Sequence, residues 1–398
     1  MDNSVSRREF MRLGAGAGLA ATLAGRSAVG AAAKPAAVGK PLRVGFIGVG
    51  GRGSSDLNQA LGCEGAEVVT ICDITPENLK RALDTVEKKT GKRPEGFGDY
   101  PYQYRQLLKR DDIDCIVIAT PCYWHEVMYV DALNAGKSFY GEKPMAITAG
   151  GVKAVAEAAK KNPKVVVQIG FQWGASPARR DIIQKVRDGL IGELLDGRFQ
   201  RLNDWDGHAG WYTDRNQSGD WMLEQAVHEF NLMWMVTRAN PISCTAVGRS
   251  GIIPGRNTTN YYTAILQYPE PLKNLVLHYS HGWIEMPGFT KMGGLRTEFV
   301  GTKGALDVMG SFVQLREKAA GGEARITGQG GDGDTREHLE NFFECVRNGT
   351  PDKANCGVAN GAGASIIGLM IRQSLEQKRP VTLEETLADT RTVPVPPV

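Results

Sequence analysis

The first half of the chain alternates short apolar runs with longer stretches of helical character. One helical stretch covers residues 148–160. Another begins at Pro76, with Thr75 as its N-cap, and runs towards Lys89. Alternating strands and helices are typical of a parallel, doubly wound sheet, which binds ligands at the carboxyl ends of its strands. We therefore expect an α/β domain over residues 41–170. Its predicted strands are the apolar runs at residues 42–47, 68–72, 114–119, 138–141 and 164–170.

The turn after the first predicted strand is rich in glycine. Residues 48–53 read Gly-Val-Gly-Gly-Arg-Gly and stand between this strand and a helical stretch. In such a turn the first glycine allows the tight bend, the second lets a pyrophosphate approach the backbone, and the third lets strand and helix pack closely. The helix N-terminus then faces the phosphate charge. We expect a dinucleotide to bind here, at Gly48, Gly50, Gly51, Arg52 and Gly53.

Asp73 follows the second predicted strand, twenty residues after Gly53. A carboxylate at this place accepts a hydrogen bond from the ribose 2′-hydroxyl of NAD and repels the 2′-phosphate of NADP. NAD is therefore the expected cofactor, and NADP is less favoured. The alternative is a glycine-rich turn with an incidental aspartate.

Two further motifs follow the next strands of the predicted sheet. Thr120, Pro121 and His125 come after the third apolar run, and Glu142 and Lys143 open a Glu-Lys-Pro motif after the fourth. With the glycine motif, their order and spacing resemble the glucose–fructose oxidoreductase / inositol dehydrogenase / MocA (Gfo/Idh/MocA) family. The resemblance covers residues 42–385 and continues, more loosely, through residues 301–304 and 338–347.

The resemblance implies a Rossmann domain followed by an α/β domain on a large, mostly antiparallel sheet. The open face of that sheet carries substrate and often an oligomer contact, so we expect a homo-oligomer. Residues 171–385 are compatible with this architecture. Strand-like segments broken by glycine or proline turns lie at residues 242–248, 261–268, 275–280, 296–300 and 313–315.

The resemblance also assigns chemistry to the Glu-Lys-Pro motif. Oxidation of an alcohol by NAD needs a hydride acceptor above the carbinol carbon and a base for the hydroxyl proton. The family places proton handling on the lysine of this motif, here Lys143. It also places Thr120, Pro121 and Glu142 at the cofactor. His125 is either a residue near the nicotinamide or simply a helix cap.

Family members usually add an Asp-x-x-x-His motif on one helix, and this chain has Glu224 and His228 instead. Four residues make about one helical turn, so the two side chains are expected to share a helix face. The carboxylate can then orient the substrate or the imidazole, and the histidine can exchange a proton. An exposed ion pair is the alternative, but the surrounding residues are mostly apolar.

Residues 203–221 are dense in aromatic side chains, carboxylates and glycine. Aromatic faces stack on pyranose rings and carboxylates accept hydroxyl protons, so we expect a carbohydrate-contact loop with Trp205, Asp206, His208 and Trp221. Core packing is the alternative for any one tryptophan. A metal site is not expected, because His278 and His281 stand three apart in a predicted strand and so point to opposite faces.

Residues 1–33 predict an export signal. A Ser-Arg-Arg-Glu-Phe-Met-Arg segment at residues 6–12 precedes a weakly apolar stretch at 13–25 and an alanine triplet at 31–33. These are the parts of a twin-arginine signal peptide. We expect export by the twin-arginine machinery to the periplasm or another extracytoplasmic compartment. Because NAD is made in the cytosol, we expect an exported enzyme to hold its cofactor tightly.

Charge and composition exclude other classes of partner. The formal net charge is +3 and no basic block is present, so nucleic acid is not an expected partner. No apolar run approaches the roughly 20 residues of a membrane-spanning helix, so no such helix is expected in the mature form. The 7 cysteines are scattered without CxxC spacing, and Cys72 and Cys115 lie in apolar runs. We therefore expect buried, reduced thiols.

These observations favour an NAD-dependent oxidoreductase acting on a sugar, cyclitol or glycoside. The first alternative is an NAD-dependent glycosidase that oxidises a sugar transiently, eliminates the glycosidic group, adds water and reduces the product again. The second is a binding or sensing protein that keeps NAD as a structural ligand. Lys143 and His228 argue against that second alternative.

Overall fold

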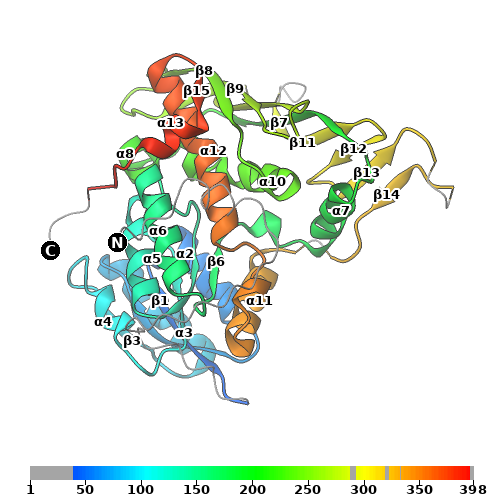
Figure 1. Cartoon of the computed structure of the whole chain (residues 1–398). Helices are drawn as coiled ribbons and strands as arrows, with labels where there is room; N and C mark the ends of the chain where they lie inside the picture. The colour runs from blue at the N-terminus through cyan, green and yellow to red at the C-terminus, as the bar shows by residue number, and fades with distance from the viewer. Residues whose placement is uncertain (1–38, 287–292, 319–321, 332, 395–398) are drawn as a thin grey trace, which may run out of the picture.

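The computed structural model describes residues 39–286, 293–318, 322–331 and 333–394. Within them the chain forms two lobes, each built on one β-sheet (Figure 1). The export signal expected over residues 1–33 lies outside the described residues. Among the residues that are described, no helix combines the length and the apolar character needed to cross a lipid bilayer.

The first sheet is parallel, in the order β3-β2-β1-β4-β5-β6. This is the strand order of a dinucleotide-binding Rossmann domain, so the predicted fold of the first domain is confirmed. The sequence does not predict the edge strand β3, because its residues are exposed or half-buried and form no apolar run. The strands are β1 (Leu42–Ile47), β2 (Ala66–Cys72), β3 (Glu95–Phe97), β4 (Cys115–Ile118), β5 (Ser138–Gly141) and β6 (Val167–Ile169).

Helices connect these strands and cover both faces of the sheet, which is why its strands are apolar throughout. α3 begins at the predicted Pro76 and ends where Gly91 adopts a left-handed conformation. The helices of this lobe are α2 (Gly51–Ala60), α3 (Pro76–Thr90), α4 (Tyr104–Leu108), α5 (His125–Asn134) and α6 (Ala149–Lys161).

The second sheet has the order β14-β13-β12-β11-β7-β10-β9-β8-β15. Among its described strands only β7 and β10 pair in parallel, so the mostly antiparallel sheet implied by the resemblance is confirmed. The strands are β7 (Leu194–Asp204), β8 (Ser243–Ser250), β9 (Thr259–Gln267), β10 (Val276–Glu285), β11 (Gly294–Gly301), β12 (Gly304–Asp307), β13 (Phe312–Leu315), β14 (Arg325–Thr327) and β15 (Val381–Thr382).

One face of this sheet is covered by α10 (Val227–Thr237) and α12 (Val358–Gln377), which lie between the sheet and the first lobe (Figure 1). The short helices α8 (Arg215–Ser218) and α9 (Trp221–Glu224) precede α10. α7 (Pro177–Arg187) and α13 (Leu383–Ala388) complete the second half.

The last part of the chain returns to the first lobe. α11 (Thr335–Asn348) packs on α2, and its Leu339, Phe342 and Phe343 share a buried core with β1. The two lobes are therefore tied together by packing as well as by the chain connection. The cysteines are all buried and free, which confirms the expectation for Cys72 and Cys115.

Candidate active site

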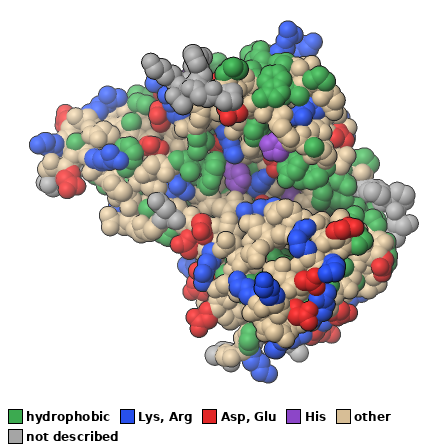
Figure 2. Space-filling view, turned by 180° about the vertical axis from the view of Figure 1, so that it is seen from behind, with side chains coloured by type: hydrophobic (Ala, Val, Ile, Leu, Met, Phe, Trp, Pro, Cys, Tyr) green, Lys and Arg blue, Asp and Glu red, His purple; other side chains and the backbone are tan. Residues whose placement is uncertain are grey.

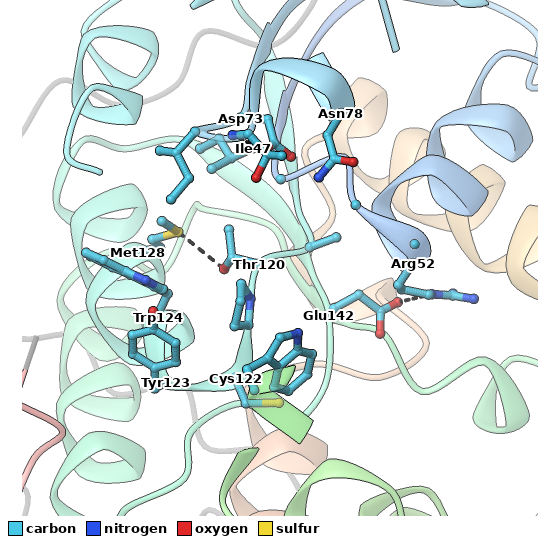
Figure 3. Close-up of a pocket in the computed structure, with 18 of the residues that line it drawn as sticks. Ile47, Arg52, Asp73, Asn78, Thr120, Cys122, Tyr123, Trp124, Met128 and Glu142 are labelled. Carbon is cyan, nitrogen blue, oxygen red and sulfur yellow. Dashed lines mark hydrogen bonds and ion pairs between the residues drawn. The ribbon is translucent and has the colours of Figure 1, made fainter. Parts of the chain in front are cut away.

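A cavity of about 320 Å³ lies at the carboxyl ends of β1, β2, β4 and β5. Its lining also includes residues of the second lobe, and Figure 2 shows the hollow between the two lobes. In Figure 3, Asp73 and Asn78 lie towards one end of the cavity and Glu142 towards the other. The predicted site residues that line it are Gly48, Gly50, Gly51, Arg52, Asp73, Thr120, Pro121, Glu142, Lys143 and Glu224.

The glycine turn has the geometry that a dinucleotide requires. Gly48 has a φ of +82°, and a Cβ there would lie 2.7 Å from the carbonyl oxygen of Ala119. A Cβ on Gly53 would lie 2.1 Å from the carbonyl oxygen of Gly48. Gly51, in contrast, has nothing within 4 Å of its Cβ position and lines the cavity. The turn is therefore closed where strand meets helix and open where a pyrophosphate would approach.

Asp73 is fixed by backbone amides at the end of β2. Its Oδ2 accepts a hydrogen bond from the amide of Val49 at 2.7 Å, and its Oδ1 accepts one from the amide of Thr75 at 2.8 Å. Each carboxylate oxygen has a further lone pair that a ribose hydroxyl can use. The residues present fit NAD at this position.

Arg52, which is half-buried, and the buried Glu142 form an ion pair in the cavity wall. Arg52 Nε donates to Glu142 Oε1 at 2.9 Å (Figure 3). Arg52 Nη2 also lies 2.9 Å from Asp56 Oδ1. Burial lowers the pKa of Arg52, but the charges of Glu142 and Asp56 outweigh this and raise it. Burial, reinforced by the charge of Glu142, raises the pKa of Asp56. Arg52 thus holds the first turn of α2 against the Glu-Lys-Pro motif.

Lys143 and Glu224 join the two lobes at the cavity. Lys143 Nζ donates to Glu224 Oε1 at 2.8 Å and also to the backbone carbonyl of Glu224. Their side chains are only 14% and 11% exposed. Burial lowers the pKa of Lys143, but the charges of Glu224, Cys122 and Glu142 and the hydrogen bond to Glu224 together outweigh it, so the net shift is upward. Lys143 is therefore an ammonium at neutral pH, and the alternative of an exposed Glu224 is excluded.

The helix expected to carry Glu224 and His228 together is interrupted between them. α9 ends at Glu224 and α10 begins at Val227, and the His228 amide donates to the carbonyl of Gln225 rather than to that of Glu224. Glu224 therefore reaches Lys143, and no hydrogen bond joins it to His228 in the described structure. The prediction that one continuous helix presents both side chains is wrong.

His228 is half-buried beside aromatic rings. Its ring centroid lies 5.1 Å from that of Trp173 and 6.1 Å from that of Phe171. Its Nδ1 is buried without a hydrogen-bond partner among the described residues. Burial, together with the charges of Lys143 and Arg201, lowers the pKa of His228 well below its usual value. His228 is therefore a neutral imidazole that can accept a proton.

His125 lies behind the cavity wall. It is the first residue of α5, and its ring nitrogens lie 2.7 Å from the carbonyl oxygen of Pro144 and 2.9 Å from that of Thr120. The N-cap of α5 is Trp124, so His125 is not the cap, and its side chain is not among those that line the cavity. His125 therefore starts α5 and links the turn after β4 to the Glu-Lys-Pro motif, and its place near the nicotinamide stays a prediction.

The expected carbohydrate loop divides into exposed and buried parts. Trp205 is 57% exposed, whereas Trp221 is 0% exposed and so cannot stack directly on a sugar. Trp221 instead packs against His208, with ring centroids 5.0 Å apart. Asp206 is buried and accepts hydrogen bonds from His208.

Several aromatic residues at the site are absent from the predicted set. Tyr123 and Trp124 line the cavity on the turn after β4, and Trp211 and Tyr212 line it from the second lobe. Trp173 lies beside His228 on the turn after β6. Three of the five directly follow a parallel strand, so the rule that ligands bind at carboxyl ends could have identified them.

The described residues contain no group of three or more His, Cys, Asp or Glu side chains that could hold a metal ion. His278 has a side chain 52% exposed and lies beside Asp196 on the outer face of the sheet. His281 is buried and bonds to Gln225. The two histidines thus point to opposite faces, as their spacing predicts.

Comparisons with curated proteins give matches over part of the chain. A glycosyl hydrolase family 109 protein of Shewanella baltica (strain OS195) is 34% identical over 206 residues, which are 48% of this chain and 44% of that protein. An alpha-N-acetylgalactosaminidase of Shewanella oneidensis is 33% identical over 205 residues, with the same shares. The match therefore spans less than half the length of these relatives.

Comparisons with solved structures show the same fold over most of the chain. A levoglucosan dehydrogenase in complex with NADH and levoglucosan has a TM-score of 0.70 and 19% identity, covering 86% of this chain and 100% of that one. A putative myo-inositol dehydrogenase from Sinorhizobium meliloti 1021 has a TM-score of 0.65 and 20% identity, covering 86% and 99%. At these identities the likeness shows the fold.

Two family models match the chain. Residues 42–171 match an oxidoreductase family with an NAD-binding Rossmann fold, and residues 180–307 match the GFO/IDH/MocA C-terminal domain. Together the two matches span more than half of the chain, in the order that the motifs and the two sheets require. The chain therefore belongs to the NAD-dependent Gfo/Idh/MocA family of enzymes.

Proposed function

We propose that this chain oxidises a hydroxyl group of a sugar, a cyclitol or a glycoside with NAD. The observation that carries the proposal is the buried Lys143–Glu224 pair, 2.8 Å apart, in a cavity that the glycine turn and Asp73 also line. Bound NAD supplies the hydride acceptor. The carbohydrate class is supported by two structural neighbours, a levoglucosan dehydrogenase and a putative myo-inositol dehydrogenase.

Lys143 and His228 have complementary protonation states for this reaction. The Lys143 ammonium donates a hydrogen bond to the substrate oxygen and stabilises the negative charge that develops there. The neutral imidazole of His228 accepts the hydroxyl proton. Glu224 keeps Lys143 charged and directed into the cavity, because its carboxylate is the partner of the ammonium.

The test combines identification of the cofactor with titration. The purified protein is denatured and any released dinucleotide is identified by mass spectrometry; the native protein is titrated with a sugar panel while the absorbance of reduced nicotinamide is followed. Retained NAD that a sugar reduces supports the proposal. If the purified protein contains no dinucleotide and is active only when dinucleotide is added, the expectation of tightly bound NAD is contradicted. No spectral change with any sugar favours a binding protein.

A second candidate is an NAD-dependent glycosidase, which the curated relatives favour because they are named as glycosyl hydrolases and as an alpha-N-acetylgalactosaminidase. Its chemistry begins with the same oxidation and ends with net addition of water across the glycosidic bond. The cofactor is regenerated in each cycle, which suits a tightly held NAD. Release of phenol from aryl glycosides without added cofactor distinguishes it from a dehydrogenase.

We also propose that the chain is exported, on the strength of the paired arginines Arg7 and Arg8 and the alanine triplet at 31–33. The test is fractionation of cells that produce the full chain and the variant R7K/R8K. The proposal expects the wild type outside the cytoplasm and the variant retained inside. Equal distribution of the two contradicts it.

A further inference from the structure

His208 is held in one orientation by a buried carboxylate. Its backbone amide donates to Asp206 Oδ1 at 2.8 Å, and its ring Nδ1 lies 2.8 Å from the same oxygen. The Asp206 side chain is 0% exposed, so this partner is kept away from water. A carboxylate accepts hydrogen bonds only, so Nδ1 carries the proton in this pair. Nε2 is left as the ring nitrogen that can exchange a proton with another molecule.

A second set of contacts fixes the carboxylate itself. Arg256 Nη1 forms an ion pair with Asp206 Oδ2, and Arg256 Nη2 donates to the carbonyl oxygen of His208 at 3.0 Å. A histidine oriented in this way by aspartate is the arrangement by which enzymes fix the tautomer of an acid–base imidazole.

Aromatic rings pack around the imidazole of His208. Its centroid lies 4.8 Å from that of Trp283, 5.0 Å from that of Trp221 and 5.3 Å from that of Tyr212. Trp221 and Trp283 also contact each other, with centroids 5.3 Å apart. The ring is therefore supported on several sides by side chains that cannot themselves take up a proton at neutral pH.

His208 is not itself among the residues that line the cavity, but it contacts one that is. Its side chain is 33% exposed, and Tyr212, which it contacts, lines the cavity with Lys143 and Glu224. Burial and the charge of Glu224 raise the pKa of Tyr212, which places the tyrosine within the electrostatic field of the site.

We propose that His208 is a second acid–base group of this site, which serves the glycosidic oxygen of a bound glycoside. In this role His208 acts as an imidazolium, with Asp206 as its counter-ion, so that Nε2 carries a proton as well as Nδ1. As the bond from the sugar carbon to the glycosidic oxygen breaks, its electron pair goes to that oxygen, and the Nε2 proton passes to the same oxygen to form the departing alcohol. The electron pair of the adjacent C–H bond forms a transient C=C bond, and the proton lost there is regained when water adds. Water then gives a proton back to Nε2 while its hydroxyl joins the carbon. One water is consumed and the electrons balance. The inference rests on the glycosidase, the second candidate under the proposed function.

This role is separate from those of Lys143 and His228. Oxidation and net hydrolysis involve two different oxygens of the sugar, and Lys143 with His228 serves the hydroxyl that is oxidised. The charged groups that face His208 are Asp206 on its own loop and Arg256 from the loop before β9. Asp206 acts through the imidazole, so it is a positioning residue.

The experiment varies the acidity of the leaving group. H208Q and D206N are assayed with phenyl and 2,4-dinitrophenyl glycosides of N-acetylgalactosamine and of a panel of other sugars. H278Q is the matched control, since His278 lies on the outer face of the second sheet. Retained NAD and an unchanged unfolding temperature establish that each variant is folded.

A phenolate that is a good leaving group needs no proton, whereas a poor one does. We therefore expect H208Q to slow release of phenol by roughly 10²–10⁴-fold, to slow release of dinitrophenol far less, and D206N to show the same selectivity. Equal losses for both leaving groups overturn the proposal, because they indicate a binding contact. Absence of release from every glycoside, with sugars still reducing bound NAD, overturns it too but leaves the oxidoreductase standing. Absence of both activities contradicts the proposed function itself.

Discussion

The ammonium of Lys143 lies 2.8 Å from the carboxylate of Glu224, and the two residues belong to different lobes. Lys143 follows β5 of the Rossmann sheet, whereas Glu224 is the last residue of α9. The contact depends on the packing of one lobe on the other, so the reactive centre exists only in the assembled molecule.

Replacement of Lys143 by alanine is expected to reduce turnover by roughly 10²–10⁴-fold while NAD stays bound. The reason is that the glycine turn and Asp73, which are expected to hold the dinucleotide, are unchanged. Steady-state kinetics and the absorbance of released cofactor measure the two effects. K80A, at an exposed lysine on α3, is the control. Wild-type turnover in K143A would show that Lys143 is not a catalytic residue.

Replacement of Glu224 by glutamine is expected to move the pH dependence of activity. Glu224 raises the pKa of Lys143, and burial acts in the opposite direction. Without the carboxylate charge, burial dominates and the pKa of Lys143 falls. If activity needs the ammonium, the alkaline limb of the profile of kcat/KM shifts to lower pH. A profile that keeps its alkaline limb in place would show that Glu224 does not control Lys143.

Replacement of Gly53 and of Gly51 by alanine should separate folding from cofactor binding. At Gly53 the new Cβ would lie 2.1 Å from a carbonyl oxygen, so we expect a loss of roughly 1–3 kcal/mol in the free energy of unfolding. At Gly51 nothing lies within 4 Å, so stability should change by less than about 1 kcal/mol. NAD affinity should nevertheless fall, because the methyl group enters the space of the pyrophosphate. Denaturant unfolding measures the stability of each variant, and dinucleotide titration measures its affinity for NAD. A larger loss of stability in G51A than in G53A, with unchanged NAD affinity in G51A, would contradict the assignment of the turn.

Replacement of Asp73 by serine is expected to weaken NAD and to relax discrimination against NADP. A hydrogen bond to a charged group contributes about 1.5–3 kcal/mol, so NAD affinity should fall roughly tenfold or more. The affinity for NADP should fall less than that for NAD, because the repulsion between the carboxylate and the 2′-phosphate disappears. The ratio of the two dissociation constants is the quantity to measure, because Asp73 also binds the amides of Val49 and Thr75. An unchanged ratio would contradict its role at the ribose.

The Rossmann half could be predicted because its signals are local. The apolar runs, the glycine turn and Asp73 each act within a few residues, and β1, β2, β4 and β5 follow from them. β7 escapes prediction because one face of its sheet is open. Only Leu194, Gly197 and Phe199 of this strand are buried, and one of the three is a glycine, so the strand contains no apolar run.

The candidate site could be predicted in its first half and only partly in its second. Lys143 stands next to a recognisable strand end, so its position follows from the fold. The interruption between Glu224 and His228 depends on distant partners: Asp220 caps α9 and also binds the amide of Thr259, while Gln225 binds His281 on β10. No local pattern records such contacts, which is why the sequence suggests one continuous helix.

Glu229, the neighbour of His228 on α10, should make stability depend on pH. It is completely buried, 3.7 Å from Arg201, and burial raises its pKa to about 7 although Arg201 opposes the shift. A carboxyl group whose pKa is higher in the folded state binds its proton more tightly there. Its contribution to stability is therefore complete below the ordinary carboxyl pKa and is lost as the pH rises towards 7.

E229Q removes this titration while keeping the size and polarity of the side chain. The free energy of unfolding of the wild type should fall between pH 4.5 and pH 7 by more than that of E229Q, and the two curves should run parallel above that range. Urea unfolding at a series of pH values measures the difference, with E376Q, at a half-exposed glutamate on α12, as the control. Parallel curves for wild type and E229Q across the whole range would mean that Arg201 keeps Glu229 ionised in the folded protein.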